Sequence, residues 1–278
     1  MRRSSIAIAL VGWSGAWAAC SSFEDAPPSS GADASTDDSS TGDGAPNIDS
    51  SSTSDASDGG GDAPFTCVGS EYYLCDGFER TGNVATGWNG VTNAVFTELS
   101  LSQKNPKTGE GSMQALILET DAGGRQGSLR RALPASATSA SMDFWVRYDD
   151  PPIADTAIGG IGLDTAEGYV FVQIAAGGGF VFAEQIKVDA GVYTTLTELQ
   201  VGVALAGTYR HVRIEVGPTL VDAGRGGRVT IDGQVNEIEL KNPTGKPVVV
   251  YLGPTFSETK PREETLWYDD VVIEATPR

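Results

Sequence analysis

Apolar and polar residues alternate in short runs from residue 65 to the end of the chain, and Gly, Pro, Asn and Asp separate the runs. In one run, Met142, Phe144 and Val146 alternate with Asp143 and Arg147. A period of two predicts strands with one buried face. The predicted strands are 94–101, 113–118, 126–133, 140–148, 168–175, 180–187, 209–216, 227–232, 235–240, 247–252 and 267–275. So many strands indicate an all-β domain, built as a two-sheet antiparallel β-sandwich.

Residues 20–64 have a different composition, dominated by Ser, Asp, Gly, Ala and Pro, with Phe23 and Ile48 as their only large apolar side chains. Such a segment cannot bury enough apolar surface to offset the entropy cost of ordering it. We therefore expect a disordered tether, followed by one folded domain at 65–278. A tether of this length reaches roughly 35 to 40 Å.

The first residues have the features of an export signal. Arg2 and Arg3 form a basic start, and 6–17 is a mainly apolar stretch too short to span a bilayer comfortably. The residues that end at Cys20 resemble a lipobox, in which small residues precede a cysteine that becomes lipidated. We expect a signal peptide at 1–19 and an exported protein anchored through Cys20 in the outer membrane or at the cell surface. The alternative is an ordinary signal-peptidase site with Cys20 incidental.

If Cys20 carries lipid, Cys67 and Cys75 are left as an even pair in an oxidising compartment. A disulfide between them is expected, and closing so short a loop stabilises the fold by about 2.5 kcal/mol. Two free thiols are the alternative.

The formal net charge of −18 argues against binding to nucleic acid. Ten of the 37 acidic residues lie between Cys20 and Phe65, where there is no Lys or Arg, and acids also outnumber bases in the rest of the chain. Such a surface repels a phosphate backbone. Contact with a membrane is expected only through the lipid anchor.

Several motifs occur together in an order that is typical of one superfamily. They are Cys75-Asp-Gly-Phe-Glu79, Phe144-Trp-Val-Arg-Tyr148, Arg210-His-Val-Arg-Ile-Glu-Val216, Val229-Thr-Ile-Asp-Gly233, Leu252-Gly253 and Trp267-Tyr-Asp-Asp-Val-Val-Ile273. Over nearly all of 65–278 the chain resembles concanavalin A-like lectin/glucanase jelly rolls, including laminin G-like domains. The resemblance implies a jelly roll with a concave face that often holds glycans, in a superfamily of both binders and glycan-cleaving enzymes.

The catalytic motifs of the enzymatic relatives are incomplete. Family 16 glycoside hydrolases carry Glu-x-Asp-x-(x)-Glu, but Gly123 and Gly124 stand where the last carboxylate would follow Glu119-Thr-Asp121. Alginate-lyase-like jelly rolls carry Gln-Ile-His, but Gln173-Ile174 is followed by Ala175. No catalytic residue is assigned, and we expect a domain that binds glycans or another surface partner without catalysis. The alternatives are a polysaccharide lyase or glycoside hydrolase with a non-standard site, and a structural, protein-binding lipoprotein.

The candidate ligand-binding residues are an aromatic residue, polar residues and a lone histidine on the decorated faces of predicted strands. Trp145 and Arg147 point the same way along one strand, and Gln173, Tyr209 and His211 would join them if all these strands lie on one concave sheet. Aromatic rings and planar donors are what sugar sites use. The competing interpretation is that Trp145 packs under a loop as part of the core.

No cofactor is required, but a structural calcium ion is a further hypothesis. Asp76 and Glu79 lie at the first strand, and Asp269 and Asp270 lie in the last one. First and last strands often lie side by side in this superfamily, and carboxylates are suitable ligands for Ca²⁺. Alternatively, one of the two aspartates of the last strand accepts hydrogen bonds from backbone amides while its neighbour is solvated.

Overall fold

The structure is a computed structural model, and every regular element among the residues that it describes is a strand. The described residues are Phe65, 73–92, 96–119, 127–150, 156–165, 168–176, 179–189, 192–202, 206–218, 226–241, 245–257 and 262–277. The predicted signal peptide at 1–19 and tether at 20–64 lie outside these residues, as does Cys67. Lipidation of Cys20 and the Cys67–Cys75 disulfide therefore stay predictions.

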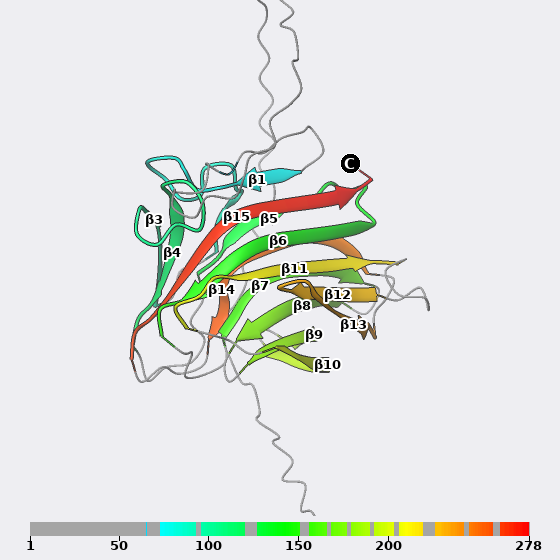
Figure 1. The fold of residues 1–278 in the computed structure, drawn as a ribbon. Helices are drawn as coiled ribbons and strands as arrows, with labels where there is room; N and C mark the ends of the chain where they lie inside the picture. Colours follow the sequence, from blue (N-terminus) through cyan, green and yellow to red (C-terminus); the bar gives the residue numbers. More distant parts are fainter. Residues whose placement is uncertain are drawn as a thin grey trace, which may run out of the picture.

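The described strands form two antiparallel sheets, as predicted (Figure 1). The first has eight strands, in the order β13 (Gln234–Glu239), β12 (Gly226–Ile231), β11 (Arg210–Gly217), β6 (Ser139–Tyr148), β15 (Glu264–Thr276), β4 (Ser112–Ile117) and β3 (Thr97–Ser102), with β1 (Leu74–Asp76) also paired to β15. The second has seven, in the order β10 (Val192–Gly202), β9 (Phe180–Asp189), β8 (Gly168–Ala176), β7 (Thr156–Thr165), β14 (Lys246–Ser257), β5 (Leu129–Ala132) and β2 (Gly90–Val91).

The core lies between the two sheets and is built from alternate residues of each strand. Val212, Ile214 and Val216 of β11 are buried, and Phe182 of β9 and Val250 of β14 belong to the same core cluster from the other sheet. Burying a side chain of this size contributes about 1.5 to 3 kcal/mol. The period of two in the sequence therefore reflects one apolar face on each sheet that is buried in the core.

The first and last strands pair directly, as the resemblance led us to expect. Leu74 lies opposite Ile273, and Asp76 lies opposite Val271. Figure 1 shows β1 running along β15 at the margin of the sheet. This pairing brings the segment around Asp76 and Glu79 close to the strand that carries Asp269 and Asp270.

Candidate functional site

One row of paired residues crosses the seven-stranded sheet and collects several polar side chains. Arg130 of β5 is opposite Tyr251 of β14, and Tyr251 is opposite Gly160 of β7. Gly160 is in turn opposite Gln173 of β8. Directly paired residues of antiparallel strands project from the same face, so these side chains share one surface.

This surface is the outer face of the sheet, opposite the core. The chain neighbours of the row, Leu129, Val250 and Ile174, are fully buried in the main core. Successive residues of a strand point to opposite faces. Consistent with this, Tyr251 packs with Val249 in a small apolar cluster separate from the main core.

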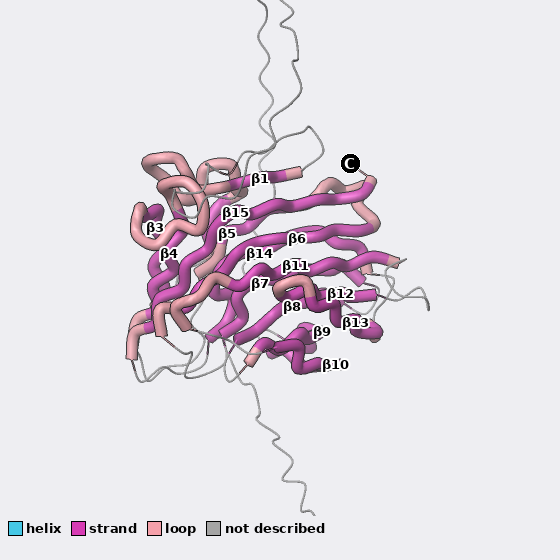
Figure 2. The backbone as a smooth tube through the Cα atoms, viewed as in Figure 1, coloured by secondary structure: helices cyan, strands magenta, loops and turns pink. Residues whose placement is uncertain are grey.

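The row places its functional groups in a defined order. The strands β5, β14, β7 and β8 follow one another across the sheet (Figure 2). Neighbouring strands are about 4.8 Å apart, so the backbones of Arg130 and Gln173 are separated by roughly 14 Å. Gly160 contributes no side chain between Tyr251 and Gln173. The result is a guanidinium and a phenol on one side of a gap and an amide on the other.

Gln173 is fixed by a chain of hydrogen bonds along the same face. Its Nε2 donates to Oε1 of Gln185 at 3.1 Å, and Nε2 of Gln185 donates to Oγ1 of Thr195 at 3.2 Å. Gln173 and Gln185 are both buried. Because these bonds fix the rotamer of Gln173, its amide has a set direction before any ligand arrives.

Small residues make up much of the surface around the row. On the three strands β7, β8 and β9, the positions of the outer face include Gly160, Gly162, Ala175 and Ala183. A ligand could approach the backbone closely here. The outer face of the seven-stranded sheet thus has small residues around the row, with Arg130 and Tyr251 on one side of Gly160 and Gln173 on the other.

The predicted ligand-binding group is split between the two sheets, so the condition under which all five residues would lie together is not met. Trp145 and Arg147 lie on β6, His211 lies on β11, and Tyr209 immediately precedes β11. These strands belong to the eight-stranded sheet, whereas Gln173 lies on the seven-stranded sheet. Similar alternation on two strands cannot reveal which sheet each strand joins.

On the eight-stranded sheet, the predicted residues already bind other protein groups. The ring of Trp145 stacks on His211 with centroids 4.8 Å apart, and Nζ of Lys107 lies 4.7 Å from the Trp145 centroid. His211 Nε2 is 2.6 Å from Oδ1 of Asp143, and this hydrogen bond raises the pKa of His211. The contact with Lys107, which belongs to the segment between β3 and β4, agrees with the interpretation that Trp145 packs under a loop.

Tyr209 and Arg147 also have partners within the protein. The Tyr209 hydroxyl donates to the backbone oxygen of Asn105 at 2.6 Å. Burial, with the nearby charge of Asp269, raises the pKa of Tyr209 above its usual range. Arg147 lies 3.6 Å from Asp149. The Tyr209 hydrogen bond holds the segment before β4 against the sheet.

The four residues of the calcium hypothesis accept hydrogen bonds from the protein. Asp76 accepts from the backbone N–H of Phe78, from Nε1 of Trp88 at 2.8 Å and from Arg80. Glu79 accepts from the backbone N–H of Glu110 at 2.9 Å. Within the described ranges, no group of three or more His, Cys, Asp or Glu side chains is arranged to hold a metal ion. The geometry therefore lends no support to the calcium hypothesis.

Asp269 and Asp270 instead hold the segment before β4. The carboxylate of Asp269 accepts from the backbone N–H groups of Lys107, Thr108 and Asp270, and Asp270 accepts from Oγ1 of Thr108. Burial, reinforced by the neighbouring charge of Asp270, raises the pKa of Asp269 to about 7. This arrangement matches the alternative interpretation in that an aspartate of the last strand binds backbone amides, but its neighbour Asp270 is buried and not solvated.

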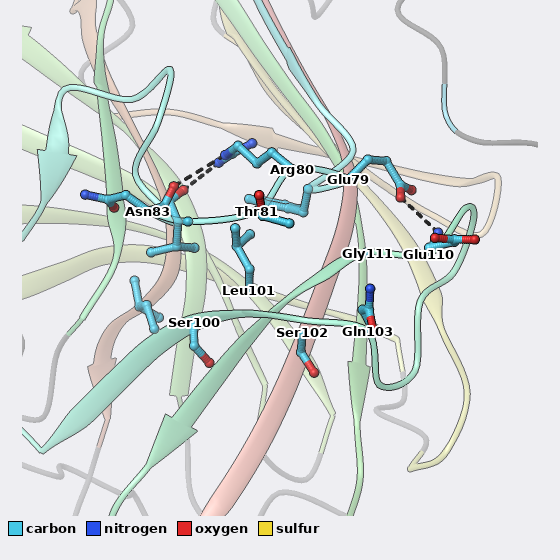
Figure 3. Close-up of a pocket in the computed structure, with 14 residues that line it drawn as sticks. Glu79, Arg80, Thr81, Asn83, Ser100, Leu101, Ser102, Gln103, Glu110 and Gly111 are labelled. Carbon is cyan, nitrogen blue, oxygen red and sulfur yellow. Dashed lines mark hydrogen bonds between the residues drawn. The ribbon is translucent and has the colours of Figure 1, made fainter.

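A cavity of about 530 Å³ lies beside β3, away from the row (Figure 3). Two of its charged side chains are already paired, because Arg80 binds Asp76 and backbone oxygens and Glu79 accepts from the backbone N–H of Glu110. Glu110 also lines the cavity, and the remaining wall is neutral and includes Ser100 and Leu101. The cavity belongs to the eight-stranded sheet and does not adjoin the outer face that carries Gln173.

Solved structures with the same fold include polysaccharide lyases. The endo-β-1,4-glucuronan lyase from the fungus Trichoderma reesei is 12% identical, with a TM-score of 0.55, over 74% of this chain and 96% of that one. The cellulose-induced protein Cip1 is 16% identical, with a TM-score of 0.52, over 73% and 97%. The alginate lyase vAL-1 from Chlorella virus is 10% identical, with a TM-score of 0.50, over 68% and 93%. At these identities the likeness establishes the jelly-roll sandwich and nothing finer.

Comparisons of sequence alone identify no relatives. No protein-family model matches the chain, and no curated protein matches it. None of the described segments contains a helix long and apolar enough to cross a membrane.

Proposed function

We propose that the outer face of the seven-stranded sheet binds an acidic polysaccharide, with a uronate unit at the row that contains Arg130, Tyr251 and Gln173. The observation that carries the proposal is this single row, in which a cation, a phenol and a fixed amide lie on three strands around a position without a side chain. Two proteins of the same fold are named for glucuronan and for alginate, both of which are uronate polymers.

Each group of the row has a part in holding a uronate. Arg130 is exposed, and a guanidinium can donate two parallel hydrogen bonds to a carboxylate. Gln173 is held by Gln185, so its amide meets a sugar oxygen without first losing rotamer entropy. Tyr251 offers an aromatic ring beside a hydroxyl, the combination that sugar sites use.

The location of the domain is part of the same proposal. A lipid on Cys20 and the tether at 20–64 would display the sheet outside the cell, where polysaccharides occur. The alternative of a structural, protein-binding lipoprotein predicts no preference for any sugar.

The binding test compares two polymers with similar linkages. Purified protein is titrated with glucuronan and with a neutral β-1,4-glucan at low and at physiological salt. The proposal expects binding to glucuronan that weakens as salt is added, because charge pairing at an exposed arginine is screened. Equal or absent binding to both polymers would refute it.

A second candidate function is uronate β-elimination, which Tyr251 favours by lying directly opposite Arg130. In this reaction a base removes the proton on the carbon next to the carboxylate, and the electron pair forms a double bond as the neighbouring glycosidic C–O bond breaks. The leaving sugar oxygen then takes up a proton. Arg130 and Gln173 would stabilise the carboxylate as negative charge develops, and the Tyr251 oxygen would move the proton.

Elimination leaves a product that simple binding cannot give. The 4,5-unsaturated uronate absorbs ultraviolet light, so incubation with glucuronan and alginate reveals it directly. Rising absorbance that Tyr251→Phe abolishes, with glucuronan affinity retained, would establish a lyase. Flat absorbance with tight binding leaves the domain as a non-catalytic binder.

A further inference from the structure

The row that carries the proposed site continues beyond Gln173 to the far edge of the sheet. Gln173 of β8 is opposite Ala183 of β9, and Ala183 is opposite Glu198 of β10. Glu198 is exposed, and it shares the outer face because Leu199, its chain neighbour, packs against the core. The row therefore has an exposed cation at one end and an exposed anion at the other.

The two charged ends are too far apart to neutralise each other. Five strand-to-strand steps separate Arg130 from Glu198, or roughly 24 Å at the usual spacing. Charges separated by more than about 8 to 10 Å in water are largely screened at physiological salt. Each end therefore acts on the part of a ligand that lies directly above it.

Between the two ends, the row itself is neutral. It consists of Tyr251, Gly160, Gln173 and Ala183. The nearest cation on the same face of β9 is Lys187, which is four residues from Ala183 and so about 13 Å along the strand. Glu198 thus sets the charge at the β10 end of the row.

We infer that the site takes a polysaccharide that is acidic at the Arg130 end and uncharged at the Glu198 end. The ligand class is then a mixed polymer of uronate and neutral sugars and not a pure polyuronate. This inference rests on the proposed function. A uronate above Glu198 would bring two carboxylates together, whereas the hydroxyls of a neutral sugar can donate hydrogen bonds to that carboxylate.

The test uses one polymer in two forms. Native glucuronan carries a carboxylate on every unit, and partial reduction of its carboxylates to alcohols gives the same backbone with neutral units interspersed. Both forms are titrated at low salt against the unmodified protein and against Glu198→Gln. Glu98→Gln is the matched control, because Glu98 is also an exposed strand glutamate but lies on β3 of the other sheet.

The inference expects the unmodified protein to prefer the partly reduced polymer. Glu198→Gln should strengthen binding of native glucuronan by about two- to fivefold, the range for removal of one exposed like-charge contact, and so erase the preference. Glu98→Gln should change neither affinity. If Glu198→Gln changes neither affinity while Arg130→Ala weakens both, the inference is wrong and the proposed site stands. If Arg130→Ala also changes nothing, the proposed function fails with it.

Discussion

Arg130 and Tyr251 lie directly opposite each other on β5 and β14, more than a hundred residues apart in the chain. Neither residue belongs to a motif, and each occupies an ordinary polar or amphipathic position of a strand. Their importance comes from the sheet order, which extends their pairing to Gly160 and Gln173. The proposed site therefore depends on the pairing register of the strands and not on a sequence motif.

Filling the gap in the row should block the site without harming the fold. Gly160→Val adds a β-branched side chain between Tyr251 and Gln173 on the outer face. Because Gly weakens a strand interior and Val favours it, the melting temperature should stay the same or rise. Glucuronan binding, measured by titration, should fall by about tenfold or more, the effect of losing one or two good polar contacts. Retained affinity would mean that the ligand does not enter this gap.

The hydrogen bonds behind Gln173 can be tested separately from Gln173 itself. Gln185→Leu removes the acceptor of the Gln173 amide, and a buried donor left without a partner costs about 1 to 3 kcal/mol. We expect the free energy of unfolding in urea to drop within that range. Affinity for glucuronan should also decrease, because the amide is no longer fixed. A stability loss with unchanged affinity would show that Gln173 does not contact the ligand.

Trp145 should matter for stability and not for binding. It is half-buried on the eight-stranded sheet, where it contacts His211 and Lys107. Trp145→Ala should cost about 1 to 3 kcal/mol, below the 3 to 5 kcal/mol typical of a fully buried large aromatic residue. Affinity per folded molecule should be unchanged, and a selective loss of glycan binding would transfer the site to this sheet.

Stability should fall as the pH rises from about 4 to 7, because the pKa of Asp269 is raised from 3.8 to about 7 in the folded protein. In that range the folded state holds a proton that the unfolded state has lost, so unfolding is favoured by each increase in pH. The contribution of Asp269 is complete below its unfolded pKa and is lost as the pH passes through its folded pKa. The slope approaches about 1.4 kcal/mol per pH unit for one group.

Asp269→Asn should flatten this slope in urea unfolding curves recorded across the same pH range. The pKa of Asp270 and that of His211 are also raised, so these groups add slope of the same sign. For His211 the loss begins above its unfolded pKa of about 6.5 and continues through the raised folded value. An unchanged slope in Asp269→Asn would show that this carboxyl titrates normally.

The sequence pattern predicts most of the fold because one face of nearly every strand is buried in the core. The pattern does not predict two long strands, β7 and β10. β7 contains Gly159, Gly160 and Gly162, and glycine is depleted in strands. Gly159 packs closely against the facing sheet, since a Cβ there would lie 2.9 Å from Cε of Met142 and that side chain would have to shift. β10 is rich in threonine and lacks a clean alternation, because its pairing with β9 contains register shifts.

The site was less predictable than the fold for a physical reason. The alternation of apolar and polar residues predicts which side chains point away from the core. It does not predict which of the two sheets a strand joins. Gln173 is a candidate from its position on the polar face of a predicted strand, whereas its partners Arg130 and Tyr251 are revealed only by the pairing of β5, β14, β7 and β8. The same ambiguity placed Trp145 and His211 with Gln173, although they lie on the other sheet.

The most direct test of the central claim is the affinity of Arg130→Ala for glucuronan, compared with Arg228→Ala. Arg228 is a half-buried arginine of β12 on the other sheet, where it binds Glu237. Titration at low salt should show about tenfold or greater weakening for Arg130→Ala, the effect of losing a charge-assisted contact, and little change for Arg228→Ala. Equal affinities of the two variants and the unmodified protein would contradict the assignment of the acidic-glycan site to the seven-stranded sheet.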